Sequence, residues 1–140
     1  MTIKIAGGCQ CGAVRYEGDV EPQVSVNCHC RACQKATGTG SMQAIAVLED
    51  TVKITGTVKY YDALADSGNT SSRGFCPECG GRVVGRTTGF PGLLAIMVGS
   101  LDDPSWFTAQ MNVHTETALP WVHMDADLPQ FPGMPEMPGG

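Results

Sequence analysis

The chain has 140 residues, of which 42% are hydrophobic and 16% are charged, and its formal net charge is −5. This composition predicts one globular domain with a core of its own. Nine lysines and arginines without a basic run, together with a pI of about 5.0, argue against nucleic-acid binding. The sequence has no apolar run of the roughly 20 residues that a membrane span needs, and no signal-peptide h-region at its N-terminus. We therefore expect a cytoplasmic protein that does not contact a membrane.

The hydrophobic pattern predicts a mainly β domain of antiparallel sheets. Short alternating or apolar segments are separated by Gly, Pro, Asp and Asn residues, which is typical of strands joined by turns. The predicted strands span residues 13–17, 23–27, 41–48, 52–55, 58–62, 82–86, 93–98 and 108–115. We expect 41–48, 52–55 and 58–62 to form a meander, and 63–72 to be a polar loop.

One short helix is predicted between the second and the third of these strands. Residues 31–36 favour helix formation, and Gly38 is typical of the position just past a helix C-terminus. The domain is expected to span residues 1–128. Residues 129–140, with four prolines and three glycines, are expected to form a loosely ordered tail.

Seven cysteines lie at spacings that are too short for an ordinary disulfide framework. In a reducing compartment, such clusters bind metal more often than they form disulfides. Cys28, Cys30 and Cys33 offer three sulfur ligands within six residues. A structural zinc has four protein ligands, whereas a catalytic zinc has three and keeps one position open. The triplet therefore predicts an open metal site.

The remaining four cysteines supply the number of ligands that a closed tetrahedral zinc site needs. Cys9 and Cys11, at positions i and i+2, would point to one face of an extended segment. Cys76 and Cys79 suit a tight turn, because Pro77 fixes φ and two glycines follow Cys79. This spacing is typical of a zinc knuckle. The count assigns all seven cysteines to two zinc ions per chain.

The motifs around these cysteines resemble one known family, the glutathione-dependent formaldehyde-activating enzymes. The motifs that carry the resemblance are GGCQCGAVRY at 7–16, CHCRACQ at 28–34, FCPECG at 75–80, GSLDDP at 99–104 and LPW at 119–121. They span most of the domain, and the arrangement of the cysteines is the most specific part. The resemblance implies a β-tent fold with one structural and one catalytic zinc. The structural zinc would be held by Cys9, Cys11, Cys76 and Cys79, and the catalytic zinc by Cys28, Cys30 and Cys33.

The resemblance also implies an activity that joins formaldehyde to the thiol of glutathione, giving S-hydroxymethylglutathione. In reverse, this activity is classed as a carbon–sulfur lyase. The expected partners are therefore a small thiol such as glutathione and a small aldehyde. An open zinc position can deprotonate a bound thiol near neutral pH, or it can polarise the aldehyde oxygen. Three thiolates leave one net negative charge on the zinc site, which favours the thiol role.

The rival interpretation is a non-enzymatic zinc-binding module, in which both sites are structural and the surface binds another protein. The triplet would then need a fourth protein ligand, for which His114 and His123 are the candidates. His29 lies between two cysteines and would point away from the metal in an extended segment. It is a candidate for a hydrogen bond to a ligand, for proton transfer or for simple packing. Four thiolates would also suit iron, as in rubredoxin-like sites.

Five arginines are candidates for binding the carboxylates of a substrate such as glutathione through paired hydrogen bonds. They are Arg15, Arg31, Arg73, Arg82 and Arg86. Each would otherwise be a solvated residue of a strand or loop. We select Arg31, because it lies within the triplet. The sequence leaves open the identity of the thiol and the aldehyde, the direction of the reaction and the oligomeric state.

Overall fold

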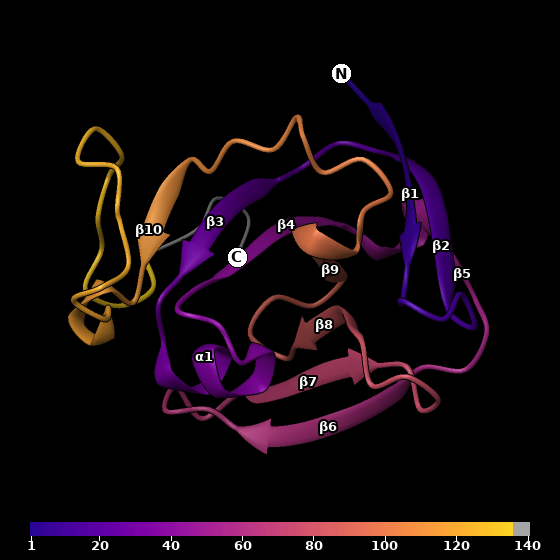
Figure 1. The fold of residues 1–140 in the computed structure, drawn as a ribbon, viewed down its shortest axis with the longest axis horizontal. Coiled ribbons are helices and arrows are strands. Elements are labelled where there is room, and N and C mark those ends of the chain that lie inside the picture. Colours follow the sequence, from indigo (N-terminus) through magenta and orange to yellow (C-terminus); the bar gives the residue numbers. More distant parts are fainter. Residues whose placement is uncertain (136–140) are drawn as a thin grey trace.

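Two β-sheets dominate the fold of this chain in a computed structural model, which describes residues 1–135. The strands in this part of the chain are β1 (Ile3–Gly8), β2 (Arg15–Val20), β3 (Val24–Cys28), β4 (Met42–Leu48), β5 (Val52–Thr55), β6 (Lys59–Leu64), β7 (Thr70–Phe75), β8 (Arg82–Thr87), β9 (Leu93–Met97) and β10 (Met111–Val113). The small sheet has the order β1-β2-β5, and the large sheet has the order β10-β3-β4-β9-β8-β7-β6. Figure 1 shows the small sheet on the side of the molecule opposite to β10.

One α-helix, α1 (Arg31–Thr37), follows β3 within the described residues. Gly38 ends the helix in the left-handed conformation with a φ of 70°, and its N–H donates to the carbonyl of Gln34. The 3-10 turns are η1 (Glu49–Thr51), η2 (Val98–Ser100) and η3 (Thr115–Thr117). The mainly β fold with one short helix after the triplet is therefore confirmed, and so is the stop at Gly38.

The main core contains buried side chains from both sheets. Ile5 and Tyr16 come from the small sheet, and Ile45, Val83 and Ile96 come from the large sheet. Burial of these apolar side chains stabilises the arrangement of one sheet against the other. A second, smaller cluster contains Val26, Cys28, Cys33 and Val113. The triplet is thus part of a separate small core at the β10 side of the large sheet.

Several strands are close to their predicted bounds. The strand predicted at 52–55 is β5, and those predicted at 23–27, 82–86 and 93–98 differ from β3, β8 and β9 by a residue at one or both ends. These segments alternate or are apolar throughout, so local pattern and tertiary structure agree. The strand predicted at 13–17 starts later, at Arg15, because residues 9–14 form a turn.

The predicted meander and polar loop are wrong. Strand β4 pairs with β3 and β9, β5 pairs with β2 in the small sheet, and β6 pairs with β7. Half of the predicted loop 63–72 is strand, because β6 extends to Leu64 and β7 begins at Thr70. Strand β7 is polar in sequence and is formed by pairing with β6 on one edge and β8 on the other. Pairing with the preceding and the following strand has overridden local propensity here.

The C-terminal part of the chain differs from its prediction in three ways. The last strand is limited to Met111–Val113, and it pairs with β3 in parallel, so the large sheet is mixed and not purely antiparallel. Residues 129–133 are not loose, because Asn112 exchanges backbone hydrogen bonds with Pro129 and Phe131, and His114 donates to Gly133. The rest of the tail, 136–140, lies outside the described residues. The division at residue 128 remains a prediction.

The helices among residues 1–135 are all too short or too polar to cross a membrane.

Candidate metal centres

Four thiols from two turns far apart in sequence meet beside the end of β1. The Sγ atom of Cys11 lies 3.7 Å from that of Cys9 and 3.7 Å from that of Cys76, although Cys11 and Cys76 are 65 residues apart. With Cys79, all four sulfurs lie within 4.8 Å of one another. Zinc–sulfur bonds of about 2.3 Å in a tetrahedron place sulfurs about 3.8 Å apart. The donor set and its spacing therefore fit a closed zinc site. We name these residues the four-cysteine group.

The two turns that carry these thiols have a similar design. Sγ of Cys9 accepts the N–H of Val14 at 3.3 Å, and Sγ of Cys76 accepts the N–H of Glu78 at 3.3 Å. Gly12 and Gly80 both have positive φ, 82° and 77°, and each donates to the carbonyl of the first cysteine of its turn. The tight turn predicted for the second pair is confirmed. The extended geometry predicted for the first pair is wrong, because the chain turns at Gly12.

Hydrogen bonds to the sulfur of Cys9 favour its thiolate form. Burial raises the pKa of Cys9, but the N–H of Val14 and the neighbouring thiols outweigh burial and bring this pKa to about 6. A metal that prefers thiolates would therefore find one ligand already deprotonated near neutral pH.

The triplet Cys28, Cys30 and Cys33 lies where β3 passes into α1. Cys28 ends the strand, Cys30 is the N-cap of the helix, and Cys33 lies in the first helical turn. The three sulfurs lie within 4.8 Å of one another. Sγ of Cys30 accepts the N–H of Cys33 at 3.2 Å, which caps the helix with a thiol. The prediction that the short helix brings Cys33 back toward the other two cysteines is confirmed.

The backbone between these cysteines is held by side chains that the sequence analysis did not select. The carbonyl of His29 accepts from Gln34 Nε2 at 2.9 Å and from Thr117 Oγ1 at 2.9 Å, and the His29 N–H donates to Val113. Gln34 is only 3% exposed. Gln34 directly follows Cys33, and an amide at that position, which can both donate and accept hydrogen bonds, is the signal that could have identified it.

None of the described histidines belongs to either cysteine group. The His29 ring is 1% exposed and contacts Asn112 Oδ1 through Nε2 at 3.0 Å. It therefore packs toward β10 and away from the sulfurs, as the alternation argument predicts. His114 lies near enough to Cys30 to help lower the pKa of that thiol, but neither His114 nor His123 places a ring nitrogen among the converging sulfurs.

The sulfurs of the triplet interact with one another and with two nearby arginines. Contacts from the thiols of Cys28 and Cys33 lower the pKa of Cys30, whereas contacts with Cys30 and Cys33 and burial raise the pKa of Cys28. Arg73 Nη2 lies 4.0 Å from Sγ of Cys33, and Arg82 also lies close enough to interact with this thiol. Three nearby sulfurs cannot all become thiolates without added positive charge, so the set suits a divalent cation.

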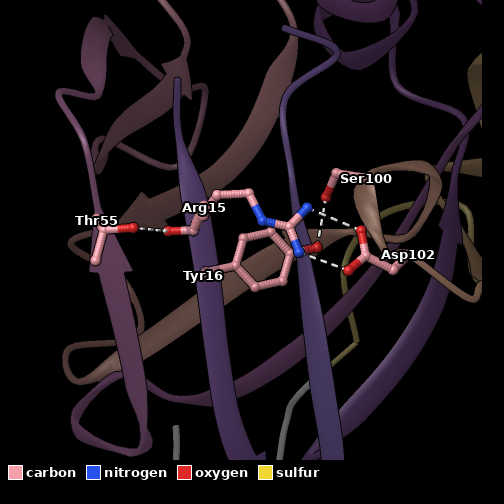
Figure 2. Close-up of polar contacts among 5 residues, drawn as sticks. All are labelled: Arg15, Tyr16, Thr55, Ser100 and Asp102. Atoms are coloured by element: carbon pink, nitrogen blue, oxygen red, sulfur yellow. Dashed lines mark hydrogen bonds and ion pairs between the residues drawn. The ribbon is translucent and has the colours of Figure 1, made fainter. Parts of the chain in front are cut away.

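The GSLDDP motif of the sequence fixes the turn after η2 against the small sheet (Figure 2). Arg15 of β2 forms two hydrogen bonds with the carboxylate of Asp102, at 2.9 and 2.5 Å. The hydroxyl of Tyr16 lies 2.7 Å from Oγ of Ser100. Thr55 of β5 adds a longer hydrogen bond to the Arg15 carbonyl, at 3.4 Å. This motif links the two sheets and contains no metal ligand.

Comparison with known proteins agrees with the motifs. The model of the family described as "Glutathione-dependent formaldehyde-activating enzyme" matches residues 4–117. The chain belongs to this family. A solved structure of a Rhodobacter sphaeroides protein is similar in fold to this member of the formaldehyde-activating family, with a TM-score of 0.55 at 17% identity. The match covers 90% of this chain and 98% of that chain. A search of curated proteins found no match.

Membership of the formaldehyde-activating family confirms the resemblance that the motifs indicated. It supports a role related to formaldehyde and glutathione at the level of the family. The two cysteine groups are consistent with zinc. The finer assignments remain predictions. They are the division into a structural and a catalytic zinc, the lyase activity and the name β-tent for the fold.

Proposed function

We propose that this protein is a zinc-dependent enzyme that forms or cleaves an adduct between a small thiol and a small aldehyde. In this proposal, Cys28, Cys30 and Cys33 hold a catalytic zinc, and the four-cysteine group holds a structural zinc. The observation that carries the proposal is the number of protein ligands in the triplet. Three sulfurs converge, and no histidine of the described residues joins them. Three protein ligands are the number that catalytic zinc sites use.

The reaction is the addition of a thiol to an aldehyde. The sulfur forms a bond to the carbonyl carbon, and the thiol proton is transferred to the carbonyl oxygen, so that a hemithioacetal is the product. In reverse, the same step is a carbon–sulfur cleavage, as the lyase classification of the family implies. With formaldehyde and glutathione as substrates, the product is S-hydroxymethylglutathione. When bound, zinc would lower the pKa of a substrate thiol below its free value of about 8.5.

The protein's own residues position this chemistry. The β3 strand end and the α1 N-cap fix the three sulfurs relative to one another. Gln34 and Thr117 hold the intervening His29 carbonyl, which keeps the loop between Cys28 and Cys30 in one conformation. Arg73 offers a positive charge beside Cys33. This charge partly offsets the negative charge that three thiolates would bring into a half-buried site.

The decisive experiment measures zinc content and hemithioacetal formation on wild type and Cys30→Ser, with a panel of small thiols and formaldehyde. Wild type should contain two zinc ions and accelerate adduct formation. Cys30→Ser should keep the fold and one zinc ion but lose the acceleration, because a serine hydroxyl is a poor zinc ligand at neutral pH. Titration of wild type with glutathione should not release the second zinc ion.

Ala32→Ser is the matched control. Ala32 is exposed and lies inside the triplet segment, so this substitution adds a hydroxyl without removing a thiol. It should keep both zinc ions and the wild-type rate. If Cys30→Ser keeps the wild-type rate with every thiol that wild type accepts, the proposal is wrong. The non-enzymatic zinc module would then be the better interpretation.

The proposal includes a cytoplasmic location. Its support is the set of clustered cysteines, which would need a reducing compartment to remain available as thiolate ligands. Fractionation of cells, with detection of the protein in the soluble cytoplasmic fraction, tests this part.

A further inference from the structure

Arg82 of β8 and Cys28 of the triplet lie on the same face of the large sheet. Side chains alternate between the two faces along a strand, and directly paired residues of neighbouring strands share a face. Cys28 of β3 pairs with Met42 of β4. Two residues further along β4, Ala44 pairs with Met97 of β9. Nη2 of Arg82 contacts the sulfur of Met97 at 3.5 Å, so Arg82 reaches the face that carries the triplet.

Arg73 of β7 lies on this face as well. It pairs with Gly85 of β8, and a Cβ atom at Gly85 would lie 3.7 Å from Nη2 of Arg82. The two guanidinium groups are therefore on the same side of the sheet. Nη2 of Arg73 lies 4.0 Å from Sγ of Cys33, and β7 runs beside α1, the helix that carries Cys33 (Figure 1). Both arginines thus lie next to the triplet, although they come from two other strands.

The guanidinium of Arg82 has buried nitrogens and no acidic partner among residues 1–135. Its Nε and Nη1 have no hydrogen-bond acceptor in this part of the chain, and the ion pairs there involve other groups. Burial lowers the pKa of Arg82 and the charge of Arg73 lowers it further, whereas the charge of Cys33 raises it. Two like charges in a partly buried place cost free energy unless negative charge lies nearby. Cys33 is the group whose negative charge reaches Arg82.

The balance of charges distinguishes the ligands that the open position of the triplet can take. A divalent metal ion with three thiolates carries one net negative charge, and an anionic fourth ligand raises this to two. A neutral fourth ligand leaves it at one. The positive charges of Arg73 and Arg82 together match the site with an anionic ligand and exceed the charge of the site with a neutral ligand. Because these charges act in a partly buried environment, the difference is screened less than in water.

We propose that Arg73 and Arg82 are positioning residues that make the open position of the triplet bind an anionic ligand in preference to a neutral one. They act through the charge at Cys33 and do not touch the ligand. The inference rests on the proposed function for the open position, and on the two guanidinium groups for the preference. A thiol bound there releases its proton to solvent and keeps the electron pair on sulfur, from which the carbon–sulfur bond can form.

The test compares an anionic and a neutral ligand on the cobalt-loaded protein. Co²⁺ can occupy zinc sites, and its absorption bands shift when the fourth ligand changes. The ligands are 2-mercaptoethanol, which binds as a thiolate, and imidazole, which binds as a neutral molecule. The four-cysteine group has no open position, so difference spectra during each titration report the triplet.

The proteins are wild type, Arg82→Gln, Arg73→Gln, Arg82→Lys and Arg86→Gln. The first two variants each remove one charge next to the triplet, and Arg82→Lys keeps that charge on a side chain of different shape. Arg86→Gln is the matched control, because it removes a positive charge from the same strand at a residue that pairs with Glu49.

Arg82→Gln and Arg73→Gln should each bind 2-mercaptoethanol about tenfold more weakly than wild type and imidazole no more weakly than wild type. Arg82→Lys should keep most of the wild-type affinity for 2-mercaptoethanol, and Arg86→Gln should bind both ligands like wild type. If Arg82→Gln does not fold, Arg73→Gln provides the same comparison.

Three results overturn the inference. The first is an unchanged affinity for 2-mercaptoethanol in the two glutamine variants, or an equal loss of affinity for both ligands. The second is an Arg82→Lys protein that binds 2-mercaptoethanol as weakly as Arg82→Gln, since the shape of the side chain and not its charge would then matter. The third is a cobalt-loaded wild type that does not bind 2-mercaptoethanol.

These outcomes are separable from those of the proposed function. If binding of 2-mercaptoethanol depends on both arginines but wild type accelerates adduct formation with no thiol, the proposed function fails and the preference for an anionic ligand stands. If wild type accelerates adduct formation, and Arg73→Gln and Arg82→Gln match its rate and its ligand affinities, the proposed function stands and the role of the two arginines fails.

Discussion

The four-cysteine group and the triplet both consist of cysteines, but they connect the chain in two different ways. In the four-cysteine group, Cys11 and Cys76 are 65 residues apart and their turns bring two distant parts of the chain together. In the triplet, Cys28, Cys30 and Cys33 lie in one strand-to-helix junction. Closing a long loop removes more entropy from the unfolded chain than closing a short one. A metal in the first group should therefore stabilise the fold, whereas a metal in the second is free to serve chemistry.

The largest expected effect is that of Cys76→Ser. Cys76 is fully buried in the main core and contacts Cys11. Binding of structural zinc is worth about 10–16 kcal/mol in small zinc domains, which is as large as the whole stability of a typical domain, about 5–15 kcal/mol. We expect the variant to be largely unfolded or insoluble, as measured by circular dichroism and thermal melting with zinc present.

A soluble Cys76→Ser protein with a cooperative melt at the wild-type temperature would contradict this expectation. Ser71→Ala is a suitable control, because Ser71 lies on β7, the strand that leads into the same turn, and carries no thiol. The control should melt within a few degrees of wild type. If both variants unfold, the sensitivity would belong to β7 and not to the metal.

The second effect concerns Cys30, whose sulfur also caps α1. Serine is a preferred N-cap residue, so Cys30→Ser should keep the helix and lose only the metal ligand. We expect one zinc ion per chain instead of two and a melting temperature within a few degrees of wild type. Cys30→Ala should lose about 1 kcal/mol more, because alanine cannot cap. Zinc analysis and urea unfolding measure both quantities. Complete unfolding of Cys30→Ser would mean that the triplet, like the four-cysteine group, is needed for folding.

The sequence was sufficient for the grouping of the cysteines, because the spacing within each pair and within the triplet is local, and the two remaining pairs together supply the four ligands of a closed zinc site. It was also sufficient for α1, where Gly38 ends a short run of helix formers. Sheet membership was not accessible in the same way. Residues 41–62 read as three consecutive strands, yet β4 and β5 pair with the distant strands β9 and β2, and β6 pairs with the following strand, β7. These pairings depend on which faces are buried together, and the local pattern does not contain that information.

The surroundings of the cysteines were less predictable than the cysteines. Arg31 was selected because it is adjacent in sequence, but it is an exposed helix residue. Arg82 lies 49 residues beyond Cys33 in the sequence, and only the fold brings it close enough to interact with that thiol. Burial of an unpaired charge is a tertiary property.

The third effect is smaller and concerns the contact between Tyr16 of the small sheet and Ser100 of η2. Tyr16→Phe removes the hydrogen bond between the Tyr16 hydroxyl and Ser100 and should cost about 1 kcal/mol without loss of zinc. Burial raises the pKa of Tyr16 to about 12, whereas a tyrosine in the unfolded chain titrates near pH 10. The folded protein therefore keeps this proton over a window in which the unfolded chain loses it, and stability falls as pH rises from about 10 to 12.

The measurement is urea unfolding of both proteins from pH 7 to 11. The stability advantage of wild type over Tyr16→Phe should shrink above pH 10, because Phe has no proton to lose. Tyr61→Phe is the control, since Tyr61 is 64% exposed and its substitution should change little. An advantage that stays constant over this range would show that the Tyr16 hydroxyl does not titrate differently in the folded state.

The smallest effect is expected for Asp102→Asn. Asp102 and Arg15 are both exposed, and exposed ion pairs contribute little because solvent and salt screen them. Hydrogen bonds from Arg15 lower the pKa of Asp102, so the contribution of this pair is present above the ordinary carboxylate pKa and is lost as pH falls through the lowered value. The difference in stability between wild type and variant should thus be small at neutral pH and low salt, and absent in high salt or strong acid.

Asp103→Asn is the matched control, because Asp103 accepts hydrogen bonds from Ser105 and not from an arginine. Thermal melts of the three proteins at low and high salt provide the comparison, and only the Asp102 variant should show a salt-dependent difference from wild type. An Asp102→Asn protein that loses zinc, or that is destabilised more than Tyr16→Phe, would mean that this ion pair, and not the metal, joins the small sheet to the turn after η2.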